Sequence, residues 1–288
     1  MSESDSTDSK ARAYRPAAVA GMFYPGSPDE LQATVDRLLA EARAKDEIAR
    51  MTPRGGAPKE APKALIVPHA GYVYSGPIAA TAFAAWADVA YRIRRVVLVG
   101  PAHRVYVAGA LVAPGAPAFR TPLGEVSVDV EAIRNVPGAI ESPRAHAREH
   151  SLEVQLPFLQ RLLPRAQIIP LLVSDAPAEV VGRALESLWD DDGTVIAISS
   201  DLSHYLEYNR ARRIDGDTAA RVLALDTTIE PERACGCAAI NGLLWVARRK
   251  GLRAQLLDLR SSGDTAGGRD QVVGYGAFAF YPADRGLE

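Results

Sequence analysis

The chain has 288 residues, of which 48% are hydrophobic and 24% are charged, as in ordinary folded globular proteins and unlike disordered or fibrous ones. Its 33 basic and 35 acidic residues give a formal charge of -2, so no overall positive field favours nucleic acid or an anionic membrane surface. No apolar run reaches the roughly 18 residues of a membrane-spanning helix, and the start of the chain lacks the apolar core of a secretory signal, so we expect a cytoplasmic protein.

The first 60 residues predict a tail, a helix and a linker. Residues 1–14 are rich in Ser, Asp and Lys and predict a disordered tail. A helix is predicted over 27–50, because Ser27 can cap its start, Pro28 suits its first position and apolar residues follow at helical spacing. The Pro- and Gly-rich stretch 52–63 predicts a linker.

From residue 64 onward, short apolar runs alternate with helical patterns such as the one over 76–93. Runs that are apolar on both faces and are separated by helices are typical of a mostly parallel sheet covered on both sides. We therefore predict an α/β fold, a single three-layer domain over 15–288. Its central strands are expected at 64–67, 95–100, 167–173 and 194–200, with two more at 253–262 and 271–282 near an edge, where they can run antiparallel.

Polar side chains follow these predicted strands directly. His69 and His103 follow the first two strands, Asp175 follows the third, and Asp201 and His204 follow the fourth. In an open parallel sheet, ligands bind beyond the carboxyl ends of the strands. A single histidine there is usually a loop residue that makes a hydrogen bond. Two imidazoles with one anionic ligand, however, form the kind of site that non-haem iron and catalytic zinc use.

The stretch "SSDLSHY", residues 199–205, has three interpretations. If a helical turn starts there, Asp201 and His204 lie on one face and can share an ion or a substrate. In the second interpretation Asp201 only caps that helix. In the third, His204 is a general acid or base and Asp201 orients it.

Residues 144–164 predict an amphipathic helix whose first turn carries acidic and imidazole groups. Glu149 and His150 are candidate catalytic residues, whereas the alternative is that the acids only complement the positive helix N-terminus. Besides these two, the stretch carries His146 and Glu153 as titratable groups, and Leu152, Leu156, Leu159 and Leu163 as its apolar stripe.

Two thiols are separated by one residue, which is poor spacing for a structural disulfide and suits a reducing compartment. Cys235 and Cys237 lie near the start of a predicted helix that continues through Leu243 to Val246. A helix N-terminus lowers the pKa of a thiol and so favours the metal-binding thiolate. The two side chains point in nearly opposite directions, so one should face the cleft; the alternative is that both are packing residues.

Six motifs in one order carry a family resemblance that runs from about Arg15 to Pro282. They are "PHAGYVYSG", "GPAH", "RTPLGEV", "EHSLEVQLPFL", "SSDLSHY" and "CG". Together they resemble the Memo family, whose bacterial and archaeal members are called AmmeMemoRadiSam system protein B. The resemblance implies a fold similar to that of class III extradiol dioxygenases, which are non-haem iron enzymes that open catechol rings.

The resemblance also implies a ligand set of His69, His103 and Cys235, with Asp201 and His204 as further cleft residues. After "CG" this chain has Cys237 and two alanines, where the family often has Gly-Pro-like or His-Pro-like residues, so Cys237 competes with Cys235 as the sulfur ligand. Sulfur is soft and suits copper(I), zinc or iron(II) in a redox role, so dioxygenase activity does not transfer with the fold.

The main functional hypothesis is therefore a metal-binding oxidoreductase that holds iron(II), or alternatively copper or zinc, and acts on a small molecule or peptide in the cleft. Asp201, His204, Glu149 and His150 would form the catalytic surroundings. One alternative is a binding or adaptor module for a peptide or for AmmeMemoRadiSam system partner proteins, with surface tyrosines as contacts. Another is a zinc-dependent hydrolase with His204 as acid or base. The tyrosines considered are Tyr72, Tyr74 and Tyr205.

Overall fold

Four buried strands form the middle of the sheet in the computed structural model, which describes residues 14–50, 61–189 and 193–283. They lie side by side and run parallel. Nearly every residue in them is buried, which explains why their sequences are apolar throughout. In spatial order they are β1 (Ala64–Val67), β8 (Thr194–Ser199), β2 (Arg95–Pro101) and β7 (Gln167–Val173).

The flanks of the sheet are mostly antiparallel. Next to β1 lies β11 (Val272–Pro282), followed by β10 (Leu252–Ser261) at the edge, and both pairings are antiparallel. On the other side, β3 (Leu111–Ala113) runs antiparallel to β7, and β6 (Ile140–Glu141) pairs parallel with β3. The expectation of two antiparallel strands near an edge is confirmed. The short β9 (His204–Leu206) pairs with β11, and β4 (Ala118–Thr121) with β5 (Gly124–Ser127) forms a separate pair.

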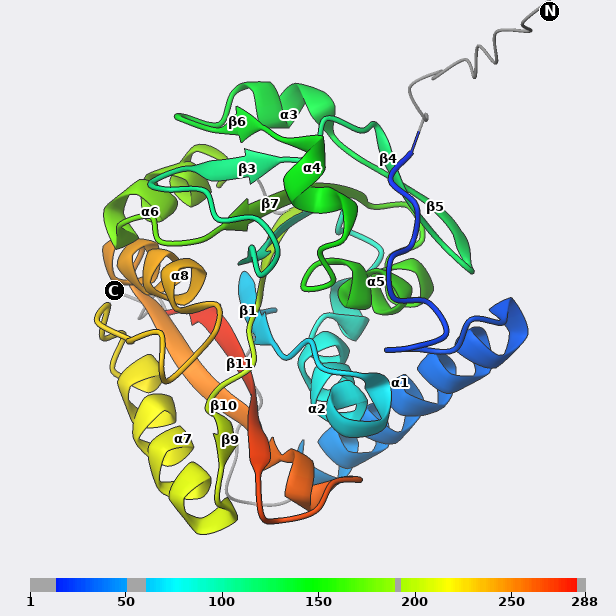
Figure 1. The fold of residues 1–288 in the computed structure, drawn as a ribbon, viewed down its shortest axis with the longest axis vertical. Coiled ribbons are helices and arrows are strands. Elements are labelled where there is room, and N and C mark those ends of the chain that lie inside the picture. Colours follow the sequence, from blue (N-terminus) through cyan, green and yellow to red (C-terminus); the bar gives the residue numbers. More distant parts are fainter. Residues whose placement is uncertain (1–13, 51–60, 190–192, 284–288) are drawn as a thin grey trace, which may run out of the picture.

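Helices cover both faces of the sheet, in two groups (Figure 1). Successive side chains of a strand point to opposite faces, so Leu65 and Val67 enter one apolar core while Ile66 enters the other. The predicted three-layer α/β fold with a mostly parallel central sheet is confirmed. On one side lie α1 (Pro28–Arg50), α2 (Tyr72–Ala84) and α5 (Leu156–Leu162); on the other lie α6 (Ala178–Ser187), α7 (Tyr208–Leu223) and α8 (Cys237–Arg249). The short helices are η1 (Ala87–Val89), α3 (Val130–Arg134), α4 (Pro143–Ala147), η2 (Glu153–Gln155) and η3 (Ser262–Asp264).

Two helix predictions need correction. The helix predicted over 76–93 begins at Tyr72, directly after the extended residue Gly71, and ends at Ala84. The single helix predicted over 144–164 is wrong, because α4 ends at Ala147 and a turn separates it from η2 and α5. In that turn the Glu149 carboxylate accepts hydrogen bonds from the backbone N–H groups of His150 and Ser151, which replace helical bonds.

The predicted tail and linker fall mainly outside the described residues. Of the tail, only Tyr14 is described, and its hydroxyl accepts a hydrogen bond from Arg120 at 3.0 Å. Residues 52–60 of the predicted linker are likewise outside the described part, and residues 61–63 lead directly into β1. Both the tail and the 15–288 domain boundaries stay predictions.

Candidate metal centre

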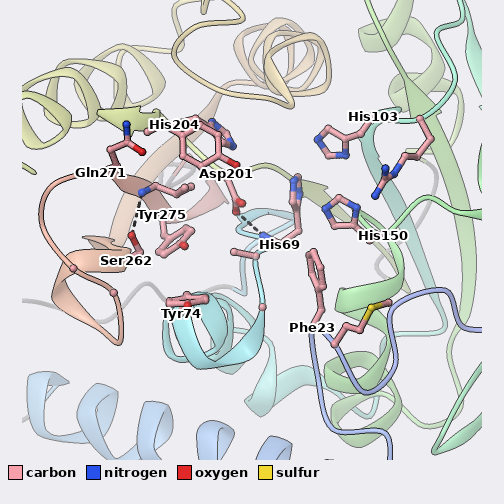
Figure 2. Close-up of a pocket in the computed structure, with 18 residues that line it drawn as sticks. Phe23, His69, Tyr74, His103, His150, Asp201, His204, Ser262, Gln271 and Tyr275 are labelled. Carbon is pink, nitrogen blue, oxygen red and sulfur yellow. Dashed lines mark hydrogen bonds between the residues drawn. The ribbon is translucent and has the colours of Figure 1, made fainter. Parts of the chain in front are cut away.

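A pocket of about 730 Å³ opens at the carboxyl edge of the central strands (Figure 2). Since β1, β8 and β2 are neighbours, the loops that follow them meet at this edge. His69 follows β1, Asp201 follows β8 and His103 follows β2, and all three line the pocket. The other lining residues used below are Met22, Phe23, Tyr74, His150, His204, Tyr205, Ser262, Gln271, Val273 and Tyr275.

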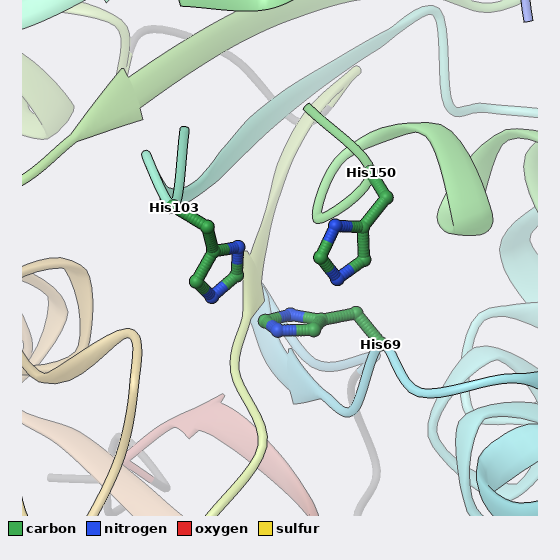
Figure 3. Close-up of side chains that lie close together, drawn as sticks. All are labelled: His69, His103 and His150. Atoms are coloured by element: carbon green, nitrogen blue, oxygen red, sulfur yellow. The ribbon is translucent and has the colours of Figure 1, made fainter. Parts of the chain in front are cut away.

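Three imidazoles converge in this pocket (Figure 3). His69, His103 and His150 each offer one ring nitrogen, and these atoms all lie within 4.8 Å of one another. The rings of His103 and His150 are stacked with centroids 4.9 Å apart, and the His69 ring lies 5.3 Å from that of His103 and 5.6 Å from that of His150. The cluster could therefore hold a metal ion.

Hydrogen bonds fix the tautomer of His69. The Ser199 hydroxyl donates its one proton to the Ser151 carbonyl at 2.6 Å, so it accepts from Gln155 Nε2 and from His69 Nδ1, each at 2.9 Å. Nδ1 of His69 therefore carries the proton, and Nε2 keeps its lone pair. Burial, reinforced by the neighbouring His103, lowers the pKa of His69 well below its usual range. The ring is held neutral, which is the form that binds metal.

Glu149 orients the imidazole of His103. Its buried carboxylate accepts hydrogen bonds from the backbone N–H of His103 at 2.6 Å and from His103 Nδ1 at 2.9 Å, which leaves Nε2 of His103 free. Burial alone raises the pKa of Glu149, but the hydrogen bond and charge of His103 and the backbone N–H of Ser151 lower it to about 2. The ionised carboxylate also lies 3.5 Å from Nδ1 of His150. Its geometry suits orientation of imidazoles; a catalytic role stays a prediction.

Asp201 and His204 both line the pocket, but the helical turn considered for them is absent. Residues 200–203 lead into β9, whose first residue is His204. The buried Asp201 carboxylate instead accepts a hydrogen bond from the backbone N–H of His69 at 2.7 Å and so supports the turn after β1. Burial raises the pKa of Asp201 to about 7. The interpretation of Asp201 as the cap of a following helix is wrong, and their catalytic role stays a prediction.

Cys235 touches the cluster at His69. Its Sγ lies 3.3 Å from His69 Nε2, and because that nitrogen has no proton the thiol donates to it. The following Gly236 permits this approach, since a Cβ there would lie 2.8 Å from the Ser199 carbonyl oxygen. Burial raises the pKa of the Cys235 thiol, contrary to the lowering predicted from the start of α8.

The three-residue group found among the described residues contains His150 and not Cys235. The ligand set His69, His103 and Cys235 therefore stays a prediction, and the structure adds His150 as a third imidazole. Cys237 begins α8 and packs against the apolar core on that side of the sheet. Of the two thiols, it is Cys235 that lies against a cluster histidine.

Several polar residues singled out from the sequence lie away from the pocket. His146 is buried and its Nε2 is hydrogen bonded to the Val112 carbonyl at 2.8 Å. Asp175 accepts hydrogen bonds from the Tyr106 hydroxyl and from the backbone N–H of Gly109. Tyr72, considered as a partner contact, is buried, with its hydroxyl donating to a backbone carbonyl.

One wall of the pocket comes from a segment that the sequence did not connect with the site. Met22 and Phe23 precede α1, yet both line the pocket, and the Phe23 ring lies 4.7 Å from that of His150. The fully buried Glu153 anchors this segment. Its carboxylate pairs with Arg15 and accepts hydrogen bonds from the backbone N–H of Ala18 and Val19 and from the Tyr24 hydroxyl.

Fold and cluster together define an α/β protein with a candidate three-imidazole metal centre at the carboxyl edge of its parallel strands. The sequence matches the family described as Memo-like protein over residues 15–279. The chain therefore belongs to the Memo family, and the resemblance stated from its motifs is confirmed.

The chain is similar in sequence to curated relatives over nearly their whole length. A MEMO1 family protein of Archaeoglobus fulgidus is 35% identical over 276 residues, covering 91% of this chain and 97% of that protein. One from Aquifex aeolicus is 36% identical, with the same coverage of 91% and 97%. Within the described residues, no helix combines the length and apolarity needed to cross a membrane.

Proposed function

We propose that this protein is a cytoplasmic oxidoreductase that binds iron(II) or copper at His69, His103 and His150, with Cys235 as a further ligand. The observation that carries the proposal is the convergence of three ring nitrogens within 4.8 Å. The Nδ1 atoms of His69 and His103 are tied to Ser199 and Glu149, so that their Nε2 lone pairs are available.

The donor set fits such an ion. Imidazole nitrogens suit iron, copper and zinc, and a thiolate adds preference for softer ions such as copper(I). Cys235 donates to His69 Nε2 at 3.3 Å, so an ion entering there would take the place of that thiol proton. A bound iron or copper ion would supply activation of oxygen or peroxide. Asp201 and His204, on the pocket wall, are the candidates for holding and moving protons near it.

Metal analysis after anaerobic purification tests the proposal. We expect close to one iron or copper ion per wild-type chain, and strongly reduced content in His69→Ala, His103→Ala and His150→Ala. His204→Ala is the matched control, since it removes an imidazole of the same pocket that is outside the three-residue group, and it should keep the metal. Unchanged metal content in all three cluster variants would reject these ligands.

Cys235→Ser tests the sulfur ligand separately. If the thiolate binds the ion, this variant loses copper(I) affinity more than iron(II) affinity, because the hydroxyl is a hard donor. If Cys235→Ser binds each of the two ions as tightly as the wild type does, His150 is the third ligand and Cys235 only lies beside the ion.

A binding or adaptor function is the second candidate. It is supported by apolar side chains at the pocket, since Met22 is 72% exposed and Tyr74 is 38% exposed. Capture of AmmeMemoRadiSam system partner proteins that survives metal removal would favour it.

A zinc-dependent hydrolase is a further alternative. After metal removal, such an enzyme would regain activity when zinc is added in air and without a reductant.

A further inference from the structure

The backbone of Tyr205 adopts a conformation that few residues with a side chain tolerate. Its φ is +56°, and among the described residues Leu225 is the one other non-glycine residue with a positive φ. This left-handed region is unfavourable for residues with a Cβ, which is why glycine usually occupies it. Strain of this kind persists where the surrounding structure imposes it, and it is concentrated at functional sites.

The pairing of β9 with β11 explains how the strain arises. Leu206 pairs with Val272 and His204 pairs with Val273, so a step of two residues on β9 matches a step of one residue on β11. Tyr205 is therefore the extra residue of a β-bulge. In a regular strand, His204 and Tyr205 would point to opposite faces, whereas here both line the pocket.

The Tyr205 ring contributes little to the protein's own packing. Tyr205 is 70% exposed, and its ring contact is an edge-on approach to His204 with centroids 5.9 Å apart. A strained residue whose ring is mostly open to the pocket gives no stability in return for the strain. A bulge beside a pocket is typical of side chains aimed at a ligand.

Aromatic side chains line the end of the pocket opposite His103 and His150. Figure 2 shows Tyr74 and Tyr275 on one side of His69, and His103 and His150 on the other. Tyr74, Tyr205 and Tyr275 all line the same pocket, and burial raises the pKa of Tyr275. Ser262, Gln271 and Val273 also line the pocket, and His204 and the Asp201 carboxyl group lie on the same side of His69 as these tyrosines.

We propose that Tyr205, together with Tyr74, forms a subsite for an uncharged aromatic ring of the ligand. The flat ring faces of two tyrosines favour stacked or edge-on contact with another aromatic ring, and Gln271 and Ser262, which line the same pocket, offer hydrogen-bonding groups to a ring substituent. The proposal rests on the proposed function in one respect: the remainder of the same ligand extends toward the three imidazoles.

Phenol and cyclohexanol form a matched probe pair, since both carry one hydroxyl and differ in the flatness and π system of the ring. Ligand-observed NMR titration of the full chain should show tighter binding of phenol than of cyclohexanol. Tyr205→Gly and Tyr205→Ala should weaken phenol binding roughly 3- to 10-fold. Tyr205→Phe, which keeps the ring, should bind phenol like the wild type. Tyr91→Ala is the control, because Tyr91 is 77% exposed and does not line the pocket.

Thermal unfolding separates a ligand role from a structural one. Because glycine favours positive φ, Tyr205→Gly should unfold at the wild-type Tm or roughly 2 °C higher, while it loses phenol affinity. Equal binding of phenol and cyclohexanol by the wild type, or unchanged phenol binding in Tyr205→Gly, would overturn the proposal. So would a lower Tm in that variant, since it would show that the ring supports the fold. Metal content measured on the same samples reports on the proposed function independently.

Discussion

At the scale of single residues, Glu149 organises the candidate centre. One carboxylate accepts hydrogen bonds from Nδ1 of His103 and from the backbone N–H groups of His103, His150 and Ser151. It therefore fixes both the ring of His103 and the turn that presents His150. Partners of this kind are as important to a metal site as the ligands themselves.

Glu149→Gln should lower metal affinity by about 10- to 100-fold. The amide keeps the shape of the side chain but removes the charge, and it places an N–H where acceptors are needed. Competition with a chelator of known affinity measures the change. Glu131→Gln, an exposed carboxylate at the start of α3, is the control and should not differ from the wild type. A Glu149→Gln affinity within twofold of the wild type would contradict this role.

His146 makes the stability dependent on pH. Burial lowers its pKa to about 4, below the value of about 6.5 expected in the unfolded chain. Between these values the unfolded state binds the proton more readily, so the contribution of His146 is complete above pH 6.5 and is lost as the pH falls toward 4. The loss amounts to about 2 to 3 kcal/mol.

In His146→Gln, the free energy of unfolding should therefore fall less steeply between pH 6.5 and 4 than in the wild type. Urea titrations at several pH values measure the two slopes. The buried imidazoles of the pocket add the same pH dependence to the free energy of unfolding of both proteins. The difference between the two slopes therefore isolates His146. Identical slopes would contradict the assignment.

At the scale of elements, the segment before α1 is a wall of the pocket held by one buried ion pair. Arg15 pairs with Glu153 and also donates to the backbone carbonyls of His146 and Glu149, which joins the segment to the turn that carries His150. Phe23 at its far end lies against the His150 ring. Order in this segment and order in the cluster are therefore coupled.

Glu153→Gln should destabilise the protein by about 3 to 5 kcal/mol, because it leaves the buried Arg15 charge unpaired. The segment should also become more sensitive to limited proteolysis. Glu41→Gln is the matched control, since it removes the carboxylate of an exposed pair with Arg37 and should change little. Equal stability of the two variants would argue against Glu153 as the anchor.

At the scale of the whole molecule, the cluster depends on the strand order. Adjacent β1, β8 and β2 bring His69, Ser199 and His103 together from three distant parts of the sequence. An ion that bridges such segments binds only the native state, so it should stabilise that state by about 2.7 kcal/mol at 100 times its Kd.

Removal of the ion with a chelator should therefore lower the Tm of the wild-type protein, and readdition should restore it. The Tm of His69→Ala should not respond to either step. Differential scanning calorimetry measures both, and an equal response in the two proteins would show that the ion binds elsewhere.

The sequence predicted most of the fold, because buried strands and the polar residues that directly follow them are local signals. His69, His103, Asp201 and His204 were placed at strand ends correctly for this reason. His150 was assigned to a helix, because leucine spacing does not reveal that a carboxylate captures the backbone N–H groups of a turn. Phe23 and the bulge at Tyr205 depend on long-range contacts and on strand register, for which no local pattern exists.

The pocket is built from both extremes of the described chain, Phe23 before the first helix and Tyr275 in the last strand. During synthesis Phe23 is made long before Tyr275, so one wall must wait for the other. The complete pocket therefore cannot exist before the chain has been synthesised through β11, and any molecule that needs all of its walls can be admitted only after that strand has joined the sheet.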